Sequence, residues 1–208
     1  MLTRRHFVIT SATLFSGALG LPAAAQDRVD FDTTVDRPDP DPFANNPWGL
    51  HPRFMPTRVA HRDGMTPGDI HVDAVAKYLY HIGDDGTAMR YGVAIGRADL
   101  YESGVFSIRR KAEWPSWRPT DNMIEREPEV YGQFADGMPG GPENPLGARA
   151  LYLYEGGRDT YLRIHGTPQP WSIGTSASSG CVRMVNAHIM DMYERVELGV
   201  TAHLYPPA

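Results

Sequence analysis

Short runs of alternating apolar and polar residues recur along most of the chain, and turn-forming residues bound each run. These runs predict strands at residues 69–73, 77–82, 89–95, 148–154, 160–165 and 201–205. The 208 residues include 21 glycines and 18 prolines, which is typical of a chain with many turns. The pattern predicts a mostly β fold and argues against a helical bundle.

Residues 109–144 follow neither a strand nor a helix pattern over most of their length. They are rich in proline, tryptophan and glycine, and they contain one short predicted helix near residues 120–126, with Thr120 as its N-cap. An irregular segment of this length is uncommon inside a compact domain unless it is functional. We therefore expect it to form a lid or the wall of a groove.

A second helix is predicted near the C-terminus, where Asn186 is the expected N-cap and Gly199 suits the exit. Its apolar positions follow helical spacing: Ile189, Met192, Tyr193 and Val196. The chain is thus expected to carry one or two short helices beside its strands.

The first 25 residues have the features of a secretory signal. Adjacent arginines, Arg4 and Arg5, precede an apolar run at residues 8–21, and small residues follow up to Ala25. The arginine pair, with Phe7 two positions on, resembles the twin-arginine export signal. The apolar run is shorter than the roughly 20 residues that span a bilayer. We expect cleavage after Ala25, no stable membrane span in the mature chain, and an exported, periplasmic protein.

Residues 26–65 form an acidic, proline-rich arm in this prediction, and residues 66–208 form the folded domain. Trp48, Leu50 and Phe54 give the arm apolar side chains that can pack on the domain. Without the signal, 18 basic residues stand against 25 acidic ones, a net charge of −7. This acidic balance argues against nucleic acid as a partner.

Histidines recur at positions 51, 61, 71 and 81, a spacing that raises the question of a metal site. Ten-residue spacing places them on no common helix face, and neither cysteines nor clustered carboxylates accompany them. We interpret the spacing as coincidence and predict no metal centre.

Cys181 is the only cysteine, so the chain can form no internal disulfide. A thiol becomes a strong nucleophile when a nearby imidazole takes its proton, and His165 lies at the end of a predicted strand sixteen residues upstream. The backbone N–H groups of Gly180 and Cys181 could stabilise an oxyanion. On spacing alone, a catalytic pair and a buried thiol beside a packed histidine are about equally good interpretations.

Other conspicuous residues have structural interpretations. Arg163 is expected to be an ion-pair partner, and His188 is expected to be solvated on the polar side of the terminal helix. Trp114 and Trp117 are expected to be packing anchors rather than groove residues. Three tyrosines alternate along strands as cross-strand pairs would, and we expect them to be structural: Tyr152, Tyr154 and Tyr161.

Several short motifs change the weighting of these alternatives. They are His165-Gly166-Thr167, Ser172-Ile173-Gly174, Ser178-x-Gly180-Cys181-x-Arg183-Met184, Lys111-Ala112-Glu113-Trp114-Pro115-x-Trp117, Met138-Pro139-Gly140-Gly141-Pro142 and Asn144-Pro145-Leu146-Gly147. Together they resemble the L,D-transpeptidase catalytic domain (the YkuD domain), and the resemblance covers roughly Thr66 to the C-terminus. It implies a β-sandwich of mixed sheets with a lid over the cleft.

The resemblance also implies roles for particular residues. Cys181 would be the nucleophile and His165 the general base and acid. Gly180 and Cys181 would donate backbone N–H groups to the oxyanion, and Arg183 would orient the loop or meet a substrate carboxylate. The remaining motif residues would support the substrate site: Ser178, Ser179, Gly166 and Thr167. Many family members carry histidine at the position of Ser179, so this chain departs from the family pattern there.

The activity implied is attack on the tetrapeptide stems of peptidoglycan, with release of D-alanine and a thioester on Cys181. A second stem would resolve the thioester as a 3→3 cross-link, and alternative acceptors are an envelope lipoprotein lysine or a free D-amino acid. No metal or organic cofactor is implied, and β-lactams would acylate the same thiol. Two alternatives stay open: an L,D-carboxypeptidase that hydrolyses the same bond, and a non-catalytic wall-binding domain.

Overall fold

The computed structural model describes residues 46–207. The predicted signal, at residues 1–25, lies outside the described residues, as does the predicted arm up to residue 45. Among the residues described, no helix has the length and apolar character required to cross a bilayer.

Nine strands form one mixed sheet in the order β1-β4-β3-β2-β11-β6-β7-β8-β10. One half of it consists of β1 (Thr57–Ala60), β2 (Ile70–Asp73), β3 (Tyr78–Ile82) and β4 (Thr87–Gly92). The other half consists of β6 (Gly104–Glu113), β7 (Arg149–Glu155), β8 (Arg158–Thr167), β10 (Val182–Val185) and β11 (Thr201–Leu204). The pairs β11–β2 and β8–β10 are parallel, and the other neighbours are antiparallel. The predicted mostly β fold of mixed strands is confirmed.

A second, two-stranded parallel sheet lies beside the first and consists of β5 (Ile95–Gly96) and β9 (Ser176–Ser178). Just before β5, Ala94 and Arg183 exchange backbone hydrogen bonds of 3.0 and 2.8 Å. This bridge connects the end of β4 to β10, so the two halves of the large sheet are tied together at the site of interest.

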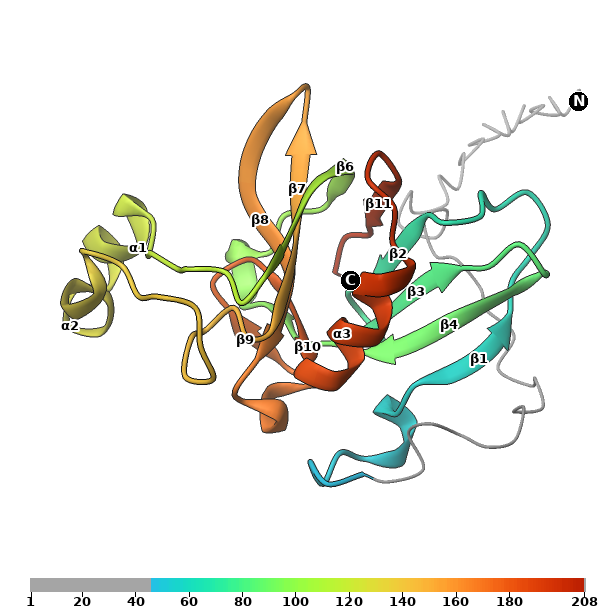
Figure 1. Cartoon of the computed structure of the whole chain (residues 1–208), viewed down its shortest axis with the longest axis horizontal. Helices are drawn as coiled ribbons and strands as arrows, with labels where there is room; N and C mark the ends of the chain where they lie inside the picture. Colours follow the sequence, from blue (N-terminus) through green and yellow to red (C-terminus); the bar gives the residue numbers. More distant parts are fainter. Residues whose placement is uncertain (1–45, 208) are drawn as a thin grey trace, which may run out of the picture.

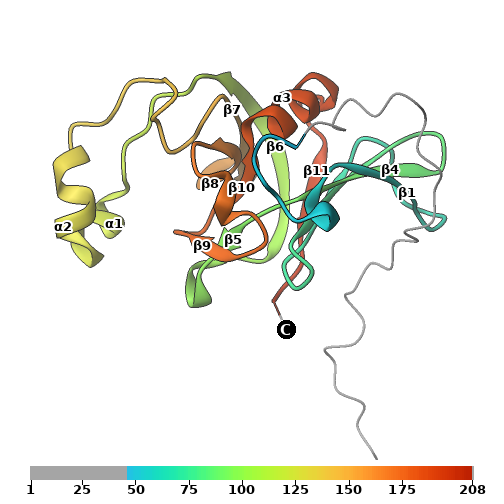
Figure 2. The ribbon, with the colours of Figure 1, turned by 90° about the horizontal axis from the view of Figure 1, so that it is seen from below.

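The helices are α1 (Asp121–Arg126), α2 (Pro128–Tyr131) and α3 (Asn186–Arg195), with 3₁₀ turns at Pro52–Phe54, Ala98–Leu100, Gly132–Phe134 and Pro170–Ser172. Figures 1 and 2 show α1 and α2 at one end of the molecule, away from β1–β4, whereas α3 packs beside the sheet. The lid is the segment 114–146, which contains α1 and α2. The predicted Thr120 cap is confirmed, because its side chain accepts a hydrogen bond from the Met123 N–H.

The main core cluster draws side chains from both halves of the sheet and from α3. Ile70 and Leu79 contribute from one half, Leu151 and Ile164 from the other, and all are fully buried. Complete burial of each such side chain stabilises the fold by about 1.5–3 kcal/mol. The core therefore holds the two halves in one unit and fixes β8 and β10 in place.

Three predictions about local structure were wrong. The segment from Arg109 is not irregular at its start, because β6 continues to Glu113 in register with β7. Asn186 does not cap α3: it is the first helical residue, and its Oδ1 accepts from the Ala148 N–H at 2.9 Å. His188 is not solvated but completely buried.

His188 is buried because the upstream segment covers α3. Leu50 and Phe54 are buried in a second apolar cluster, and Trp48 packs against it. The Trp48 ring meets the His188 ring edge to face, with 5.2 Å between centroids. The apolar residues predicted to pack on the domain therefore do so, and they exclude water from His188.

This burial makes stability depend on pH. Burial lowers the pKa of His188 from 6.5 to about 4. Between these two pH values the unfolded chain binds a proton at His188 and the folded chain does not, so the free energy of unfolding falls as the pH falls. Glutamine does not titrate, so we expect the free energy of unfolding of His188→Gln to fall less than that of the wild type between pH 7 and pH 4, by about 3 kcal/mol. Urea unfolding at each pH measures this, with the exposed His51→Gln as control. The same dependence of unfolding free energy on pH in the wild type and in His188→Gln would contradict the expectation.

Candidate active site

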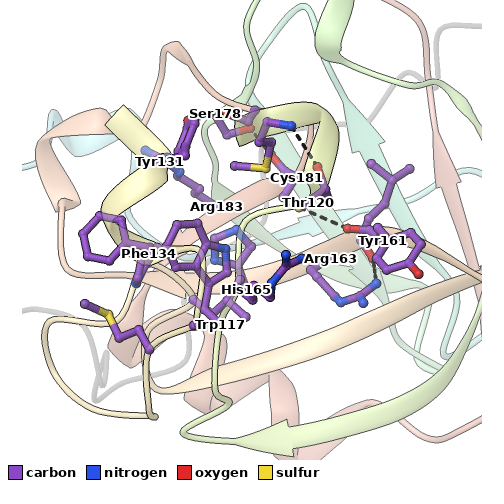
Figure 3. Close-up of a pocket in the computed structure, with 18 of the residues that line it drawn as sticks. Trp117, Thr120, Tyr131, Phe134, Tyr161, Arg163, His165, Ser178, Cys181 and Arg183 are labelled. Atoms are coloured by element: carbon purple, nitrogen blue, oxygen red, sulfur yellow. Dashed lines mark hydrogen bonds between the residues drawn. The ribbon is translucent and has the colours of Figure 1, made fainter. Parts of the chain in front are cut away.

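The pairing of β8 with β10 determines which face of the sheet carries the candidate residues. The strands run parallel, with Arg183 directly opposite His165. Cys181 lies in the bend just before β10, two residues from Arg183, and is on the same side of the sheet as His165. All three side chains line one cavity, and Figure 3 shows how they lie in it.

The cavity has a volume of about 1400 Å³. Residues of β8 and β10 line it from the sheet, and the lid contributes Trp117, Tyr131, Phe134 and Met138 from the other side. The predicted lid is thus a wall of the cavity that contains Cys181. Trp117, which we expected to be only a packing anchor, is one of the groove residues.

His165 is held in one orientation by the backbone. Only 4% of its surface is exposed, and its Nδ1 lies 2.6 Å from the carbonyl oxygen of Gly166. Because a carbonyl oxygen only accepts, Nδ1 carries the proton in this contact, and the neutral ring has its lone pair on Nε2. Burial, and next the positive charge of Arg183, lower the pKa of His165 to about 3. The ring is therefore a neutral proton acceptor at ordinary pH.

The Cys181 thiol lies against the backbone of β8. Its Sγ is 3.8 Å from the carbonyl oxygen of Tyr161, to which the S–H can donate. Burial raises the pKa of this thiol above its ordinary value, while a backbone hydrogen bond from Arg163 and the charges of Arg163 and Arg183 act in the opposite direction. With His165 neutral as well, the resting pair is a thiol and an imidazole rather than a thiolate and an imidazolium.

The loop before Cys181 has a backbone that only glycine accommodates well. Gly180 has φ of +127°, and a Cβ there would lie 3.0 Å from the carbonyl oxygen of Leu100. The Ser178 hydroxyl donates to the Cys181 carbonyl and accepts from the Gly180 N–H at 3.3 Å. To bind an oxyanion, the Gly180 N–H must give up this long hydrogen bond to Ser178 and donate to the substrate oxygen instead.

The two arginines beside the site differ in their partners. Arg163 forms a two-pronged ion pair with Asp159, at 2.6 and 2.9 Å, which confirms its predicted structural role. Arg183 reaches the side-chain oxygen of Gln169 at 3.4 Å and forms no ion pair with a carboxylate within residues 46–207. Arg183 is therefore a cation beside Cys181 that is free to receive an anionic group.

The residues predicted to support the substrate site all lie close to Cys181 and His165 in the chain. Gly166 is buried against α3, where a Cβ would lie 2.1 Å from Asn186 Oδ1. Thr167 is buried and accepts from the Gln169 N–H at 3.1 Å through its hydroxyl. Ser178 is buried within the loop, whereas the Ser179 hydroxyl lies 2.8 Å from the Tyr131 hydroxyl of the lid.

Sequence reasoning missed three tyrosines that line the cavity: Tyr131, Tyr152 and Tyr161. Tyr161 was expected to be structural, but it has φ of 63°, is 69% exposed and lines the cavity beside Cys181. Tyr161 fits the apolar–polar alternation of its strand, and that pattern gives no sign of the positive φ that the residue adopts. Tyr131 lay in a segment without periodicity, so no sequence signal placed it opposite Ser179.

One group of side chains within residues 46–207 has the composition of a metal site, and it lines a different cavity. It comprises Asp69, His71 and His203, with candidate ligand atoms within 4.8 Å of one another. The imidazoles are stacked, with 4.5 Å between centroids and 5° between planes, so their lone pairs lie in parallel planes and cannot both point straight at one ion. Of the four evenly spaced histidines, His71 alone belongs to this group.

Known proteins share both this sequence pattern and this fold. The sequence model of the L,D-transpeptidase catalytic domain (YkuD) matches residues 67–204. The "Putative L,D-transpeptidase in ATP synthase subunits region ORF 5" of Fuscovulum blasticum is 30% identical over 199 residues, which cover 94% of this chain and 93% of that one. The probable L,D-transpeptidase ErfK/SrfK of Escherichia coli K12 is 30% identical over 153 residues, 72% of this chain and 47% of that protein.

A crystal structure from Brucella melitensis, described as a probable carnitine operon oxidoreductase, is similar with a TM-score of 0.51. It is 52% identical, and the match covers 73% of this chain and 93% of that one. The chain spans about half the length of the Escherichia coli protein. The match over residues 67–204 shows that this chain belongs to the L,D-transpeptidase catalytic domain family, which confirms the resemblance found in its motifs.

The neutral pair predicts how Cys181 reacts with a small alkylating reagent. Because only the thiolate reacts, the iodoacetamide rate is expected to rise with pH through a pKa above that of an ordinary cysteine. Stopped-flow alkylation between pH 5 and pH 10, with Cys181→Ser as the blank, measures the profile. A fast plateau already present at pH 6 would instead mean a preformed thiolate and imidazolium.

Proposed function

We propose that this protein is a cysteine acyltransferase, an L,D-transpeptidase that acts on the tetrapeptide stems of peptidoglycan. The observation that carries the proposal is the placement of Cys181 and His165 on one face of the sheet, in a cavity walled by the lid. The membership of residues 67–204 in the L,D-transpeptidase catalytic domain family supports the choice of substrate.

In the acylation step, Cys181 Sγ attacks the carbonyl carbon between the third stem residue, at its L-centre, and the terminal D-alanine. The S–H proton passes to His165 Nε2 during the attack, because both groups are neutral at rest. His165 then returns this proton to the nitrogen of the departing D-alanine, and a thioester remains on Cys181.

The tetrahedral intermediate carries negative charge on the former carbonyl oxygen. The backbone N–H groups of Gly180 and Cys181 lie at the turn before β10 and are the proposed donors to this oxygen. The φ of +127° at Gly180 supports this role, because it sets an amide orientation that other residues rarely allow.

Arg183 is the proposed contact for a substrate carboxylate. Asp159 already neutralises Arg163, whereas the Arg183 guanidinium meets only an uncharged amide oxygen among the described contacts. A stem peptide carries carboxylates near the scissile bond, and a charge-assisted hydrogen bond to one of them would orient that bond over Cys181.

The thioester is resolved by an amine. The proposed acceptor is the side-chain amine of a second stem, which gives a 3→3 cross-link. An envelope lipoprotein lysine or a free D-amino acid has the same chemistry, and β-lactams that resemble the stem would acylate the same thiol. The N-terminal signal predicted from the sequence would take the protein to the periplasm, where these substrates lie.

Purified residues 26–208 and a Cys181→Ala variant, incubated with tetrapeptide stems, provide the direct test. We expect release of D-alanine and new cross-linked dimers by mass spectrometry with the wild type and neither product with the variant. Tripeptides without dimers would show that water is the acceptor, and the enzyme would then be a carboxypeptidase. No reaction of the wild type would contradict the proposal and favour a wall-binding role.

The contribution of Arg183 can be measured separately. Arg183→Gln is expected to lower kcat/KM for D-alanine release about 10- to 100-fold, because a hydrogen bond to a charged group contributes about 1.5–3 kcal/mol. Arg183→Lys keeps the charge and is expected to retain part of the activity. The matched control is Arg158→Gln, an exposed arginine at the β7–β8 turn. Unchanged kinetics in Arg183→Gln would remove Arg183 from the substrate site.

A further inference from the structure

The lid has internal contacts that hold it as a folded unit. The Trp117 ring meets Tyr131 edge to face, with 6.4 Å between centroids, and meets Phe134 in the same way at 5.6 Å. The backbones of Trp117 and Met138 exchange hydrogen bonds of 2.9 and 2.7 Å. The aromatic cluster therefore fixes where Tyr131 lies relative to the rest of the lid.

This unit contacts the loop before Cys181 directly. The Tyr131 hydroxyl at the end of α2 lies 2.8 Å from the Ser179 hydroxyl, within hydrogen-bond distance. Ser179 precedes Gly180, so this contact lies next to the proposed oxyanion donor and two residues from the thiol. Figure 3 shows Tyr131 on the lid side of the cavity, close to Ser178 and Arg183.

A second contact joins the lid to the same loop. Glu127, between α1 and α2, forms an ion pair with Arg97, which lies just after β5. The Arg97 N–H donates to the carbonyl oxygen of Ser178 at 2.9 Å. The lid is thus connected to two consecutive residues of the loop, to Ser179 through a side chain and to Ser178 through Arg97.

We propose that Tyr131 is a positioning residue, and that its hydrogen bond with Ser179 couples closure of the lid to the orientation of the Gly180–Cys181 turn. With the lid shut, the bond holds Ser179, and through it the backbone that aims the Gly180 N–H and the Cys181 thiol. With the lid open, Ser179 loses this partner and the turn is freer to move. As a statement about catalysis, the inference rests on the proposed function.

The departure of this chain from the family pattern fits that coupling. Ser179 stands where many family members have histidine, and in this chain the side chain at this position is used to reach the lid. The short Ser179 side chain can reach the Tyr131 hydroxyl only while α2 lies over the loop. The hydrogen bond therefore forms only when the lid is closed. In this inference the Ser179 side chain acts through its contact with the lid.

The test is a double-mutant cycle of Tyr131→Phe, Ser179→Ala and both together, read out in two ways. Each single variant removes the same bond, so we expect each to speed iodoacetamide alkylation of Cys181 about 3- to 10-fold by releasing the lid. We expect kcat for D-alanine release to fall by a similar factor, with a smaller change in KM. The double variant is expected to match the single ones in both readouts.

Matched controls remove the same atoms elsewhere. Tyr154→Phe removes a tyrosine hydroxyl on β7, and Ser176→Ala removes an exposed serine hydroxyl on β9, and both are expected to behave as wild type. Additive effects in the double variant, or wild-type alkylation in both single variants, would overturn the coupling.

The two readouts separate the proposals. Alkylation needs no peptidoglycan, so the coupling is tested even if the wild type releases no D-alanine, an outcome that contradicts only the proposed function. Active wild type with unchanged alkylation across the cycle would contradict only the coupling. Near-ultraviolet circular dichroism of each variant checks that the core is intact, since both substituted side chains lie outside it.

Discussion

The parallel pairing of β8 with β10 is the constraint on which the rest of the site depends. β10 is four residues long and lies at the end of the strand order, so few ladder hydrogen bonds hold it. Its register is fixed because Val182 and Met184 are completely buried on one face. A slip by one residue would move Val182 and Met184 to the cavity face, and Cys181 and Arg183 would leave the cavity for the opposite face. Burial of two apolar side chains therefore aligns the thiol with His165.

Other parts of the molecule reinforce this register. The Ala94 bridge provides β10 with backbone hydrogen bonds on its outer edge, where an end strand would otherwise face solvent. Asn186, directly after β10, accepts from the Ala148 N–H before β7, so the start of α3 is attached to the same part of the sheet. Gly166 leaves room for that asparagine side chain. The candidate residues are thus held by rigid elements on both sides of the strand pair.

The electrostatics of the cavity follow from the same geometry. Burial lowers the pKa of His165 and raises that of the partly exposed Cys181 thiol, because the charged form of each lacks hydration in the cavity. The ion pair of Arg163 with Asp159 satisfies one nearby cation, and Arg183 keeps its charge directed into the cavity. A neutral pair beside the Arg183 cation suits a reaction in which charge develops only when an anionic substrate is bound and water is excluded.

The sequence by itself determined the class of fold and the two residues at the centre of the site. Alternation of apolar residues located most strands, helical spacing located α3, and the motifs around His165 and Cys181 identified the family, because each of these signals is local in the chain. The tertiary structure decided what depends on contacts between distant segments. Trp48 buries His188, β7 extends β6 to Glu113, and the lid brings Tyr131 to Ser179. No local pattern encodes such contacts, since they arise only when packing and strand register bring the segments together.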